Sequence, residues 1–194
     1  MGHRANGHRV VYVSGSPGAG KTSLAVPLAA ELGYALVTKD GIKETLHDAL
    51  GAPPPDLAWS RRLGGAAMEL LWALVADSPA VVIEANFRPY SEYERTRLTA
   101  IGAGGGQLVE VHCLCPPELA AARYNARVRH PVHVVTSLPV AAMAEYDKPV
   151  GLGELVTVDT AVPVDVARVA ARVRAHHGGG GQMRAEPRRG RAGA

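Results

Sequence analysis

Apolar positions along the chain follow two different patterns. Short continuous apolar runs, rich in β-branched residues, alternate with longer segments in which leucine, alanine or valine recurs every three or four positions. The first pattern is typical of strands buried on both faces, and the second of helices that bury one side. The runs predict strands at 9–14, 34–38, 80–84, 107–114 and 155–158. The periodic segments predict helices at 21–32, 41–50, 56–76, 91–101, 116–128, 137–146 and 163–175.

The regular alternation of strands and helices predicts the fold class. Successive strand, helix and strand segments form right-handed units that build a parallel sheet with helices on both faces. We therefore expect an α/β fold, a three-layer α/β/α sandwich with a five-stranded parallel sheet, over residues 9–176. Residues 1–8 are expected to be a flexible N-terminus. Residues 177–194 are expected to be a disordered basic tail, because their glycine, arginine and alanine mixture offers little apolar surface for packing.

Composition and charge narrow the possible partners. The chain has 194 residues, of which 47% are hydrophobic, and it contains no uninterrupted apolar stretch long enough to cross a membrane. Its net charge of +3 is carried by the C-terminal tail, so the body before the tail is neutral. A neutral body argues against a nucleic-acid partner. We expect a cytoplasmic protein without a membrane partner, either a monomer or a homodimer.

One segment carries a specific motif. It reads Gly15-Ser16-Pro17-Gly18-Ala19-Gly20-Lys21-Thr22 and continues with Ser23. This is a full match to the phosphate-binding loop G-x-x-x-x-G-K-[ST], placed between the first strand and the first helix. Its glycines let successive backbone N–H groups approach phosphate oxygens at a helix N-terminus. Lys21 is then expected to reach the β- and γ-phosphates of ATP, and Thr22 to ligate Mg²⁺.

Other classes of nucleotide-binding protein need features that this sequence does not provide. A GTPase recognises its base with Asn-Lys-x-Asp, which is absent. A motor or AAA-type ATPase needs a longer chain and a hydrophobic strand that ends in paired acids, whereas the third strand ends in Glu84 alone. A small phosphotransferase remains.

The phosphate-binding loop and the order of the elements resemble the small P-loop kinases, a family that includes shikimate, gluconate and adenylylsulfate kinases. The segment Thr38-Lys39-Asp40-Gly41 after the second strand is most similar to the branch of chloramphenicol phosphotransferase and the zeta-toxin kinases. The resemblance spans about residues 9–175, and its specific motif is the phosphate-binding loop. It implies a short arginine-bearing lid and transfer of the γ-phosphoryl group of ATP, with Mg²⁺, to a hydroxyl of a small metabolite or antibiotic.

Two further functions stay open at this point. One is a nucleotide-binding regulatory or RNA-associated protein with little kinase activity. The other is a toxin-like kinase that phosphorylates a nucleotide sugar. A kinase needs an acid and lid arginines that converge on one acceptor site, whereas a binding module does not.

Three residues near the ends of strands are candidates for substrate contacts. The resemblance implies that Asp40 is the catalytic base, and ligands of parallel sheets bind at the end of the strand that precedes it. Asp40 also fits the N-cap of the following helix, and the two roles are compatible. Glu84 either holds the substrate or a Mg²⁺-bound water, or is a buried acid with a local hydrogen bond. Arg88 either binds an anionic group of the acceptor or lies exposed.

The lid that the resemblance implies falls at about residues 123–146. Such lids neutralise the transferred phosphoryl group and exclude water. Arg123 and Arg127 are four residues apart and therefore share a helix face, although a solvated helix has the same spacing. Both are catalytic candidates, and Arg127 is preferred to Arg123 and Arg129. We expect His130 and His133 to form a polar hinge, because a metal site would need a third ligand nearby.

Overall fold

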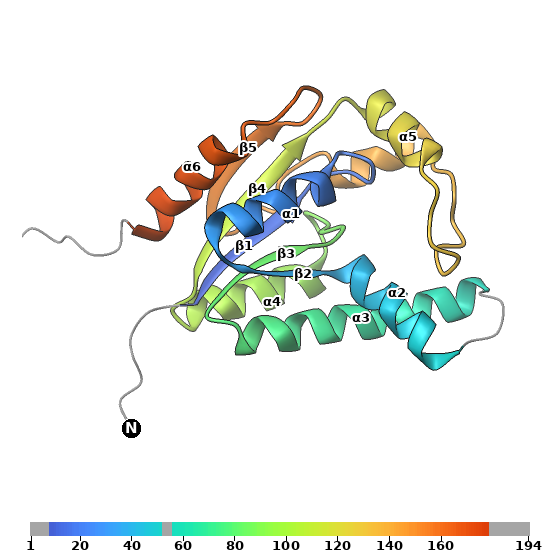
Figure 1. The fold of residues 1–194 in the computed structure, drawn as a ribbon, viewed down its shortest axis with the longest axis horizontal. Helices are drawn as coiled ribbons and strands as arrows, with labels where there is room; N and C mark the ends of the chain where they lie inside the picture. Colours follow the sequence, from blue (N-terminus) through green and yellow to red (C-terminus); the bar gives the residue numbers. More distant parts are fainter. Residues whose placement is uncertain (1–7, 52–55, 179–194) are drawn as a thin grey trace, which may run out of the picture.

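The computed structural model describes residues 8–51 and 56–178. Its strands are β1 (Arg9–Ser14), β2 (Ala35–Thr38), β3 (Ala80–Glu84), β4 (Gln107–Leu114) and β5 (Glu154–Asp159). Its α-helices are α1 (Lys21–Leu32), α2 (Lys39–Leu50), α3 (Leu57–Asp77), α4 (Glu92–Ala103), α5 (Pro117–Ala126) and α6 (Val166–Gly178), and a 3-10 helix, η1 (Val140–Tyr146), follows α5. Figure 1 shows this alternation along the chain. Among the described residues, none of the helices combines the length and the apolar character that a membrane span needs.

All five strands form one parallel sheet in the order β2-β3-β1-β4-β5. The central strand β1 pairs with β3 on one side and with β4 on the other, and its residues Val10, Val11 and Val13 are fully buried. A strand that is buried on both faces needs apolar residues at successive positions, which explains the continuous apolar run in the sequence.

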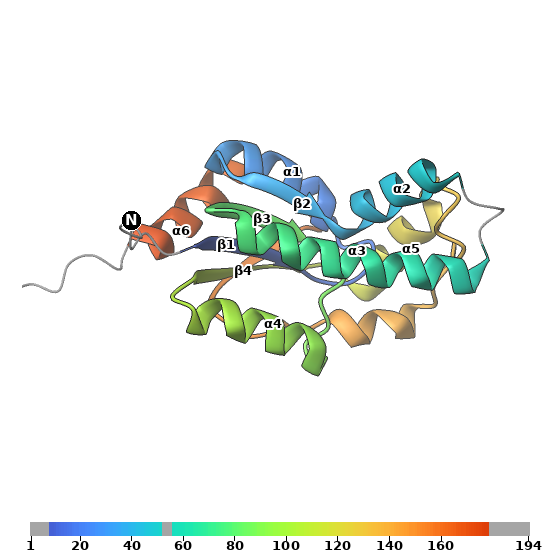
Figure 2. The ribbon, with the colours of Figure 1, turned by 90° about the horizontal axis from the view of Figure 1, so that it is seen from below.

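Helices cover both faces of this sheet. Leu24 and Leu28 of α1 and Val173 of α6 pack on one face, and Leu71 of α3 and Leu98 of α4 pack on the other. Figure 2 shows α1 and α6 on one side of the sheet and α4 on the opposite side. The expected three-layer α/β/α sandwich with a five-stranded parallel sheet is confirmed.

A buried carboxylate joins three segments at the centre of the fold. Glu110 of β4 is fully buried and accepts hydrogen bonds from the hydroxyls of Tyr12, at 2.9 Å, and Ser14, at 2.5 Å, both on β1. It also accepts from the backbone N–H groups of Val150 and Gly151, each at 2.8 Å. Four donors therefore surround its two oxygens, as a buried polar group requires.

Helix α2 begins two residues earlier than the sequence predicted. Thr38 is its N-cap, because the Thr38 hydroxyl oxygen accepts a hydrogen bond from the Gly41 N–H at 3.2 Å. Asp40 lies inside the first turn, so its expected alternative role as the N-cap is wrong. Threonine is a good cap, and its hydroxyl satisfies one of the donors that the helix start leaves without a partner.

The segment after α5 is also less helical than predicted. Helix α5 ends at Ala126, and Arg127 is extended, with φ −77° and ψ 132°. The following His130 precedes Pro131, and a residue before proline is biased away from the helical conformation. Of the helix expected over 137–146, only η1 forms, with 3-10 geometry that is typical of short connecting pieces.

The last helix lies further along the chain than expected. Asp165 caps it, since its carboxylate accepts from the Arg168 N–H at 3.0 Å, and the helix continues to Gly178. The ring of His177 stacks on Tyr34 and its Nδ1 lies 3.1 Å from the Tyr34 hydroxyl. His177 therefore belongs to the folded domain, which was expected to end at residue 176. The expected flexible N-terminus, except His8, and residues 179–194 of the expected tail lie outside the described residues, whereas Gly178 is the last residue of α6.

The Glu110 network predicts a strong effect of a nearly isosteric change on stability. In Glu110→Gln, an NH₂ group replaces one oxygen and faces a backbone N–H, so that two buried donors point at each other without an acceptor. Each unsatisfied buried group costs about 1 to 3 kcal/mol, so the free energy of unfolding should fall by roughly 2 to 5 kcal/mol. Urea unfolding measures this, and the control is Glu118→Gln, at an exposed residue of α5, which is expected to change the free energy of unfolding by less than about 0.5 kcal/mol. If Glu110→Gln and Glu118→Gln unfold at the same urea concentration, the Glu110 network does not contribute to stability as described.

Candidate active site

The phosphate-binding loop is wedged between β4 and α5. Gly15 and Gly18 both have positive φ, 131° and 81°, which side chains rarely adopt. A Cβ atom at Gly15 would lie 2.7 Å from the carbonyl oxygen of Cys113, and one at Gly18 would collide with the carbonyl oxygen of Ala120. These glycines are therefore required by the close approach of neighbouring backbone as well as by the turn itself.

The loop contributes most of its residues to a large cavity. The cavity has a volume of about 1030 Å³. Its lining includes Pro17, Gly18, Gly20, Lys21, Thr22 and Ser23. Gly15, Ser16 and Ala19, which were also expected to bind the nucleotide, are buried and do not line it. Six of the nine residues expected to bind the nucleotide thus line the cavity.

Lys21 points into the curve of the loop. Its Nζ donates to the carbonyl oxygens of Gly15 and Ser16, each at 2.9 Å, and the side chain is buried. Burial lowers the pKa of Lys21, although the nearby carboxylate of Glu84 opposes this shift. The ammonium group is thus held within the loop, at the edge of the cavity.

Thr22 and Glu84 form a pair of oxygen ligands beside Lys21. The Thr22 hydroxyl donates to Glu84 Oε2 at 3.2 Å, and both residues line the large cavity. Burial raises the pKa of Glu84, while Lys21 and the hydrogen bond from Thr22 oppose the shift. A hydroxyl and a carboxylate are hard oxygen donors of the kind that Mg²⁺ prefers, so these residues fit a Mg²⁺ ion that also binds phosphate oxygens and waters.

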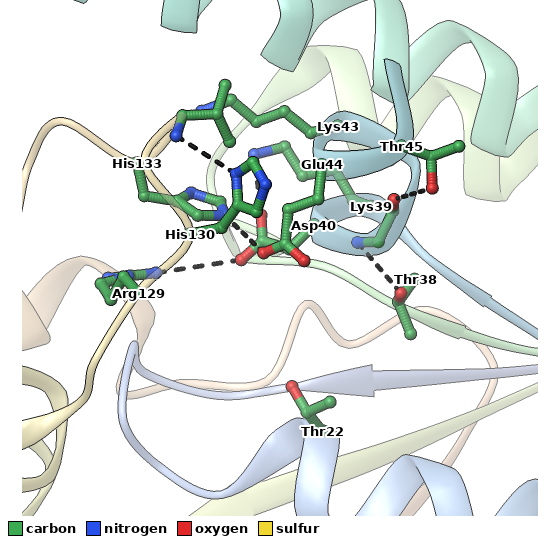
Figure 3. A network of polar contacts seen from close by, with 12 residues as sticks. Thr22, Thr38, Lys39, Asp40, Lys43, Glu44, Thr45, Arg129, His130 and His133 are labelled. Atoms are coloured by element: carbon green, nitrogen blue, oxygen red, sulfur yellow. Dashed lines mark hydrogen bonds and ion pairs between the residues drawn. The ribbon is translucent and has the colours of Figure 1, made fainter. Parts of the chain in front are cut away.

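Asp40 of α2 lines the same cavity as Thr22 and Glu84, and Figure 3 shows Asp40 together with Thr22. Its Oδ1 lies 3.1 Å from Lys39 Nζ, and its Oδ2 lies 3.9 Å from Arg129. Burial alone would raise the pKa of Asp40, but Lys39, His133 and Arg129 outweigh it and the pKa falls below its ordinary value. Asp40 is therefore an ionised carboxylate at neutral pH.

The two arginines expected to act together lie in different environments. Arg123 donates to the carbonyl oxygen of Thr160 at 2.9 Å, in the segment after β5. Arg127 lines the cavity, and its charge affects the pKa values of both Lys21 and Glu84. The prediction that they share a helix face is wrong, because α5 ends at Ala126. Arg127 is associated with the phosphate-binding loop and Arg123 with the segment after β5.

Arg129, which the sequence ranked below Arg127, is closely packed into the site. Its guanidinium carbon lies 4.2 Å from the centroid of the Tyr124 ring, and its side chain is only 10% exposed. One terminal nitrogen approaches Asp40, and the other is buried without a hydrogen-bond partner in the described part of the chain. The sequence could not predict this contact, because helix α5 ends between Tyr124 and Arg129 and a spacing of five residues is not one that brings side chains together on a helix.

Two histidines connect the segment after α5 to α2. His130 Nε2 lies 3.0 Å from Asp48 Oδ1, and His133 Nε2 lies 2.8 Å from Glu44 Oε1. Figure 3 shows both rings and Arg129 approaching α2 from the same loop. Within residues 8–51 and 56–178, no group of three or more potential ligand side chains forms a metal site. The histidines instead tie this segment to the helix that carries Asp40.

A second, smaller cavity adjoins the first. It has a volume of about 340 Å³ and lies between α2, α3 and the segment after α5. Arg88 lines it and donates from Nε to the Tyr146 hydroxyl at 3.3 Å. The two cavities share four lining residues, Asp40, Asn86, Tyr124 and Arg129. The sequence placed the acceptor pocket at residues 41–76 and 86–94 without singling out Asn86 or Lys43, although Lys43 follows Asp40 by three positions and so shares its helix face.

Comparison with known proteins gives a family and several similar structures. The profile of the AAA domain family matches residues 10–149. No curated protein matches the sequence. A candidate kinase from Chloroflexus aurantiacus J-10-fl is 27% identical, with a TM-score of 0.76, over 87% of this chain and 98% of that one.

Two further solved structures share the fold at lower identity. Shikimate kinase from Acinetobacter baumannii is 18% identical, with a TM-score of 0.55, over 87% of this chain and 92% of that one. A gluconokinase from Sinorhizobium meliloti 1021 is 20% identical, with a TM-score of 0.50, over 91% and 94%. At these identities the likeness concerns the fold alone.

The sequence argued against a motor or AAA-type ATPase and for a small phosphotransferase. The match to the AAA domain profile over residues 10–149 gives the family of the chain and no motor activity, so it leaves that argument in place. The closer resemblance to chloramphenicol phosphotransferase and the zeta-toxin kinases stays a prediction. From its family profile, its phosphate-binding loop and its fold, the chain belongs to the AAA domain family and is a small P-loop kinase-like protein.

Proposed function

We propose that this protein is an ATP-dependent kinase that transfers the γ-phosphoryl group to a hydroxyl of a small molecule. One observation carries the proposal: the Asp40 carboxylate lines both the cavity of the phosphate-binding loop and the adjoining smaller cavity. A nucleotide-binding module needs only the first cavity. A kinase needs a donor cavity and an acceptor cavity that meet at a group able to receive a proton.

ATP occupies the large cavity in this proposal. Backbone N–H groups at the start of α1 bind its phosphates, and Lys21 exchanges its carbonyl contacts for contacts with the β- and γ-phosphates. Thr22 and Glu84 hold Mg²⁺, directly or through water. When bound, the ion neutralises charge on the phosphates. Arg123 and the adjacent Thr160 segment lie on the side of the cavity where the nucleoside binds.

Asp40 orients the acceptor hydroxyl and takes up its proton. The hydroxyl oxygen forms a bond to the γ-phosphorus as the bond from that phosphorus to the β,γ-bridging oxygen breaks, and ADP leaves. The proton passes to an Asp40 oxygen, which is ionised because the lowered pKa keeps it deprotonated at neutral pH. Arg127 and Arg129 neutralise negative charge that moves between the two cavities.

The size of the acceptor cavity favours a small substrate over a nucleotide sugar. Its volume of about 340 Å³ lies near the lower end of the range for small-molecule sites. The presence of an acceptor cavity beside Asp40 also favours a transferase over a regulatory nucleotide-binding protein.

The role of Lys21 predicts the loss of nucleotide binding in Lys21→Ala. ATP with Mg²⁺ at about 100 times its dissociation constant should stabilise the wild type by about 2.7 kcal/mol. This corresponds to a rise in melting temperature of roughly 5 to 10 °C for a chain of this size. Lys21→Ala should lose this rise, whereas Lys148→Ala, at an exposed lysine outside both cavities, should keep it. An undiminished rise in Lys21→Ala would refute the assignment of the loop.

The role of Asp40 predicts a loss of catalysis without a loss of folding. Asp40→Asn removes the proton acceptor, so turnover of the acceptor should fall by at least about a hundredfold. Because Thr38 caps α2, the free energy of unfolding should change by less than about 1 kcal/mol. ATP binding should be retained.

The matched control is Asp77→Asn, which makes the same change at the exposed end of α3. Steady-state phosphoryl transfer, ATP-induced thermal shift and urea unfolding are measured on the wild type, Asp40→Asn and Asp77→Asn. Transfer by Asp40→Asn at the rate of Asp77→Asn would remove Asp40 from the reaction.

A further inference from the structure

Several cationic side chains line the smaller cavity. They come from four separate segments: α2, α3, the segment after β3 and the segment after α5. They are Lys39, Lys43, Arg61, Arg88 and Arg129. Asp40 is the one acidic residue among its lining residues. Since the phosphates of ATP are assigned to the other cavity, this concentration of positive charge needs its own explanation.

Lys43 is the most informative of these residues. Its side chain is buried, and its Nζ donates to Ser60 Oγ at 2.7 Å. The Ser60 hydroxyl in turn donates to the carbonyl oxygen of Val132 at 2.7 Å, so Ser60 is fixed as an acceptor for Lys43. A buried ammonium group that is held by a neutral hydroxyl is poorly compensated, because burying a charge is costly unless an opposite charge accompanies it.

The surroundings of Lys43 add to this cost. Burial and the positive charge of Lys39 lower the pKa of Lys43 to about 8, and Arg129 acts in the same direction. Asp40 and Glu44 oppose the shift but do not cancel it. An anion in the cavity would restore the ordinary preference for the charged form.

Arg61 and Arg88 extend the positive charge along the cavity. Arg61 is an exposed residue of α3 that lines the cavity, and Arg88 is held in place by the Tyr146 hydroxyl. Guanidinium groups bind carboxylates and phosphates through paired hydrogen bonds, which suits them for recognising an oxyanion.

We propose that the acceptor carries an oxyanion, a carboxylate or a phosphate, that binds among Lys43, Arg61 and Arg88 while its hydroxyl faces Asp40. This inference rests on the proposed kinase function and narrows its substrate to small hydroxy acids and sugar phosphates. Asp40 and Lys43 are three residues apart on one helix, which places the proton acceptor and the anion site about 5 to 6 Å apart at their Cβ atoms. That separation suits a compact molecule with both groups. Cationic antibiotics do not fit such a lining.

The first experiment tests the anion site without relying on catalysis. The full-length protein is saturated with ADP and Mg²⁺, so that the phosphate-binding loop is filled, and is titrated with malonate or sulfate while the melting temperature is followed. Three proteins are compared: the wild type, Arg61→Gln and Arg62→Gln. The neighbouring Arg62 lies near Trp59 and does not line the cavity, so it controls for the lost charge.

We expect the wild type and Arg62→Gln to bind the oxyanion equally, and Arg61→Gln to bind it at least tenfold more weakly. Lys43→Gln should show the same loss, and its ADP-induced thermal shift shows whether it is folded. Equal titrations of Arg61→Gln and Arg62→Gln would overturn the anion site.

The second experiment separates the substrate class from the kinase function. Transfer from γ-labelled ATP is measured with pairs of acceptors that differ in one charged group: glycerate and glycerol, gluconate and glucose, glucose 6-phosphate and glucose. We expect labelled product only from the acceptors that carry a charged group. For these acceptors, Arg61→Gln should raise the KM at least tenfold and change kcat little. Label in acids alone or in phosphates alone identifies which oxyanion is used.

The two hypotheses fail in different ways. Equal labelling of neutral and charged acceptors would overturn the anion requirement and leave the kinase function standing. Oxyanion binding that depends on Arg61, together with no transfer to any acceptor of either kind, would contradict the kinase function and leave the anion site standing.

Discussion

The buried carboxylate of Glu110 is the interaction on which the rest of the structure depends. Its partner Ser14 is the residue immediately before the phosphate-binding loop, and its backbone partners Val150 and Gly151 follow η1. One group therefore fixes both the start of the loop and the far end of the segment that carries Arg129. A carboxylate inside a sheet is tolerated only when donors surround it, and this requirement fixes the relative positions of all three segments.

The order of the strands assembles the proposed site. The loop follows β1, Glu84 ends β3, and Asp40 comes just after β2, and these three strands are neighbours in the parallel sheet. Parallel strands bring their carboxyl ends to one edge, where ligands bind in open α/β sheets. The segment after α5 then reaches over this edge to α2 through His130 and His133. The strand ends supply the phosphate-binding loop and the two carboxylates, and the overlying segment supplies Arg127 and Arg129.

Local signals explain which parts of this arrangement the sequence predicted. Each strand is a continuous apolar run, and the phosphate-binding loop is a contiguous motif, so neighbouring residues alone were sufficient to locate them. Asp40 and Glu84 were found because the end of a predicted strand is a definite place in the fold. The N-cap was misassigned since Thr38 and Asp40 both suit that position, and only the observed hydrogen bond from Gly41 distinguishes them.

Contacts between distant residues explain what the sequence did not predict. The position of Arg129 depends on packing over Tyr124 after α5 has ended, and the importance of Lys43 depends on Ser60 of another helix. The spacing of apolar residues along the sequence does not indicate contacts between side chains of different elements. The last turn of α6 likewise depends on a tyrosine more than a hundred residues earlier in the chain.

That tyrosine, Tyr34, lies where the two ends of the folded domain meet, and this position bears on how the protein can be fused to other molecules. The guanidinium carbon of Arg9, at the start of β1, lies 5.4 Å from the centroid of its ring, and the His177 ring, at the end of α6, stacks at 5.9 Å. The beginning and the end of the folded domain thus meet at the sheet edge opposite the phosphate-binding loop (Figure 1). Fusion partners, immobilisation tags or a surface tether joined at either end would leave the mouth of the cavity open.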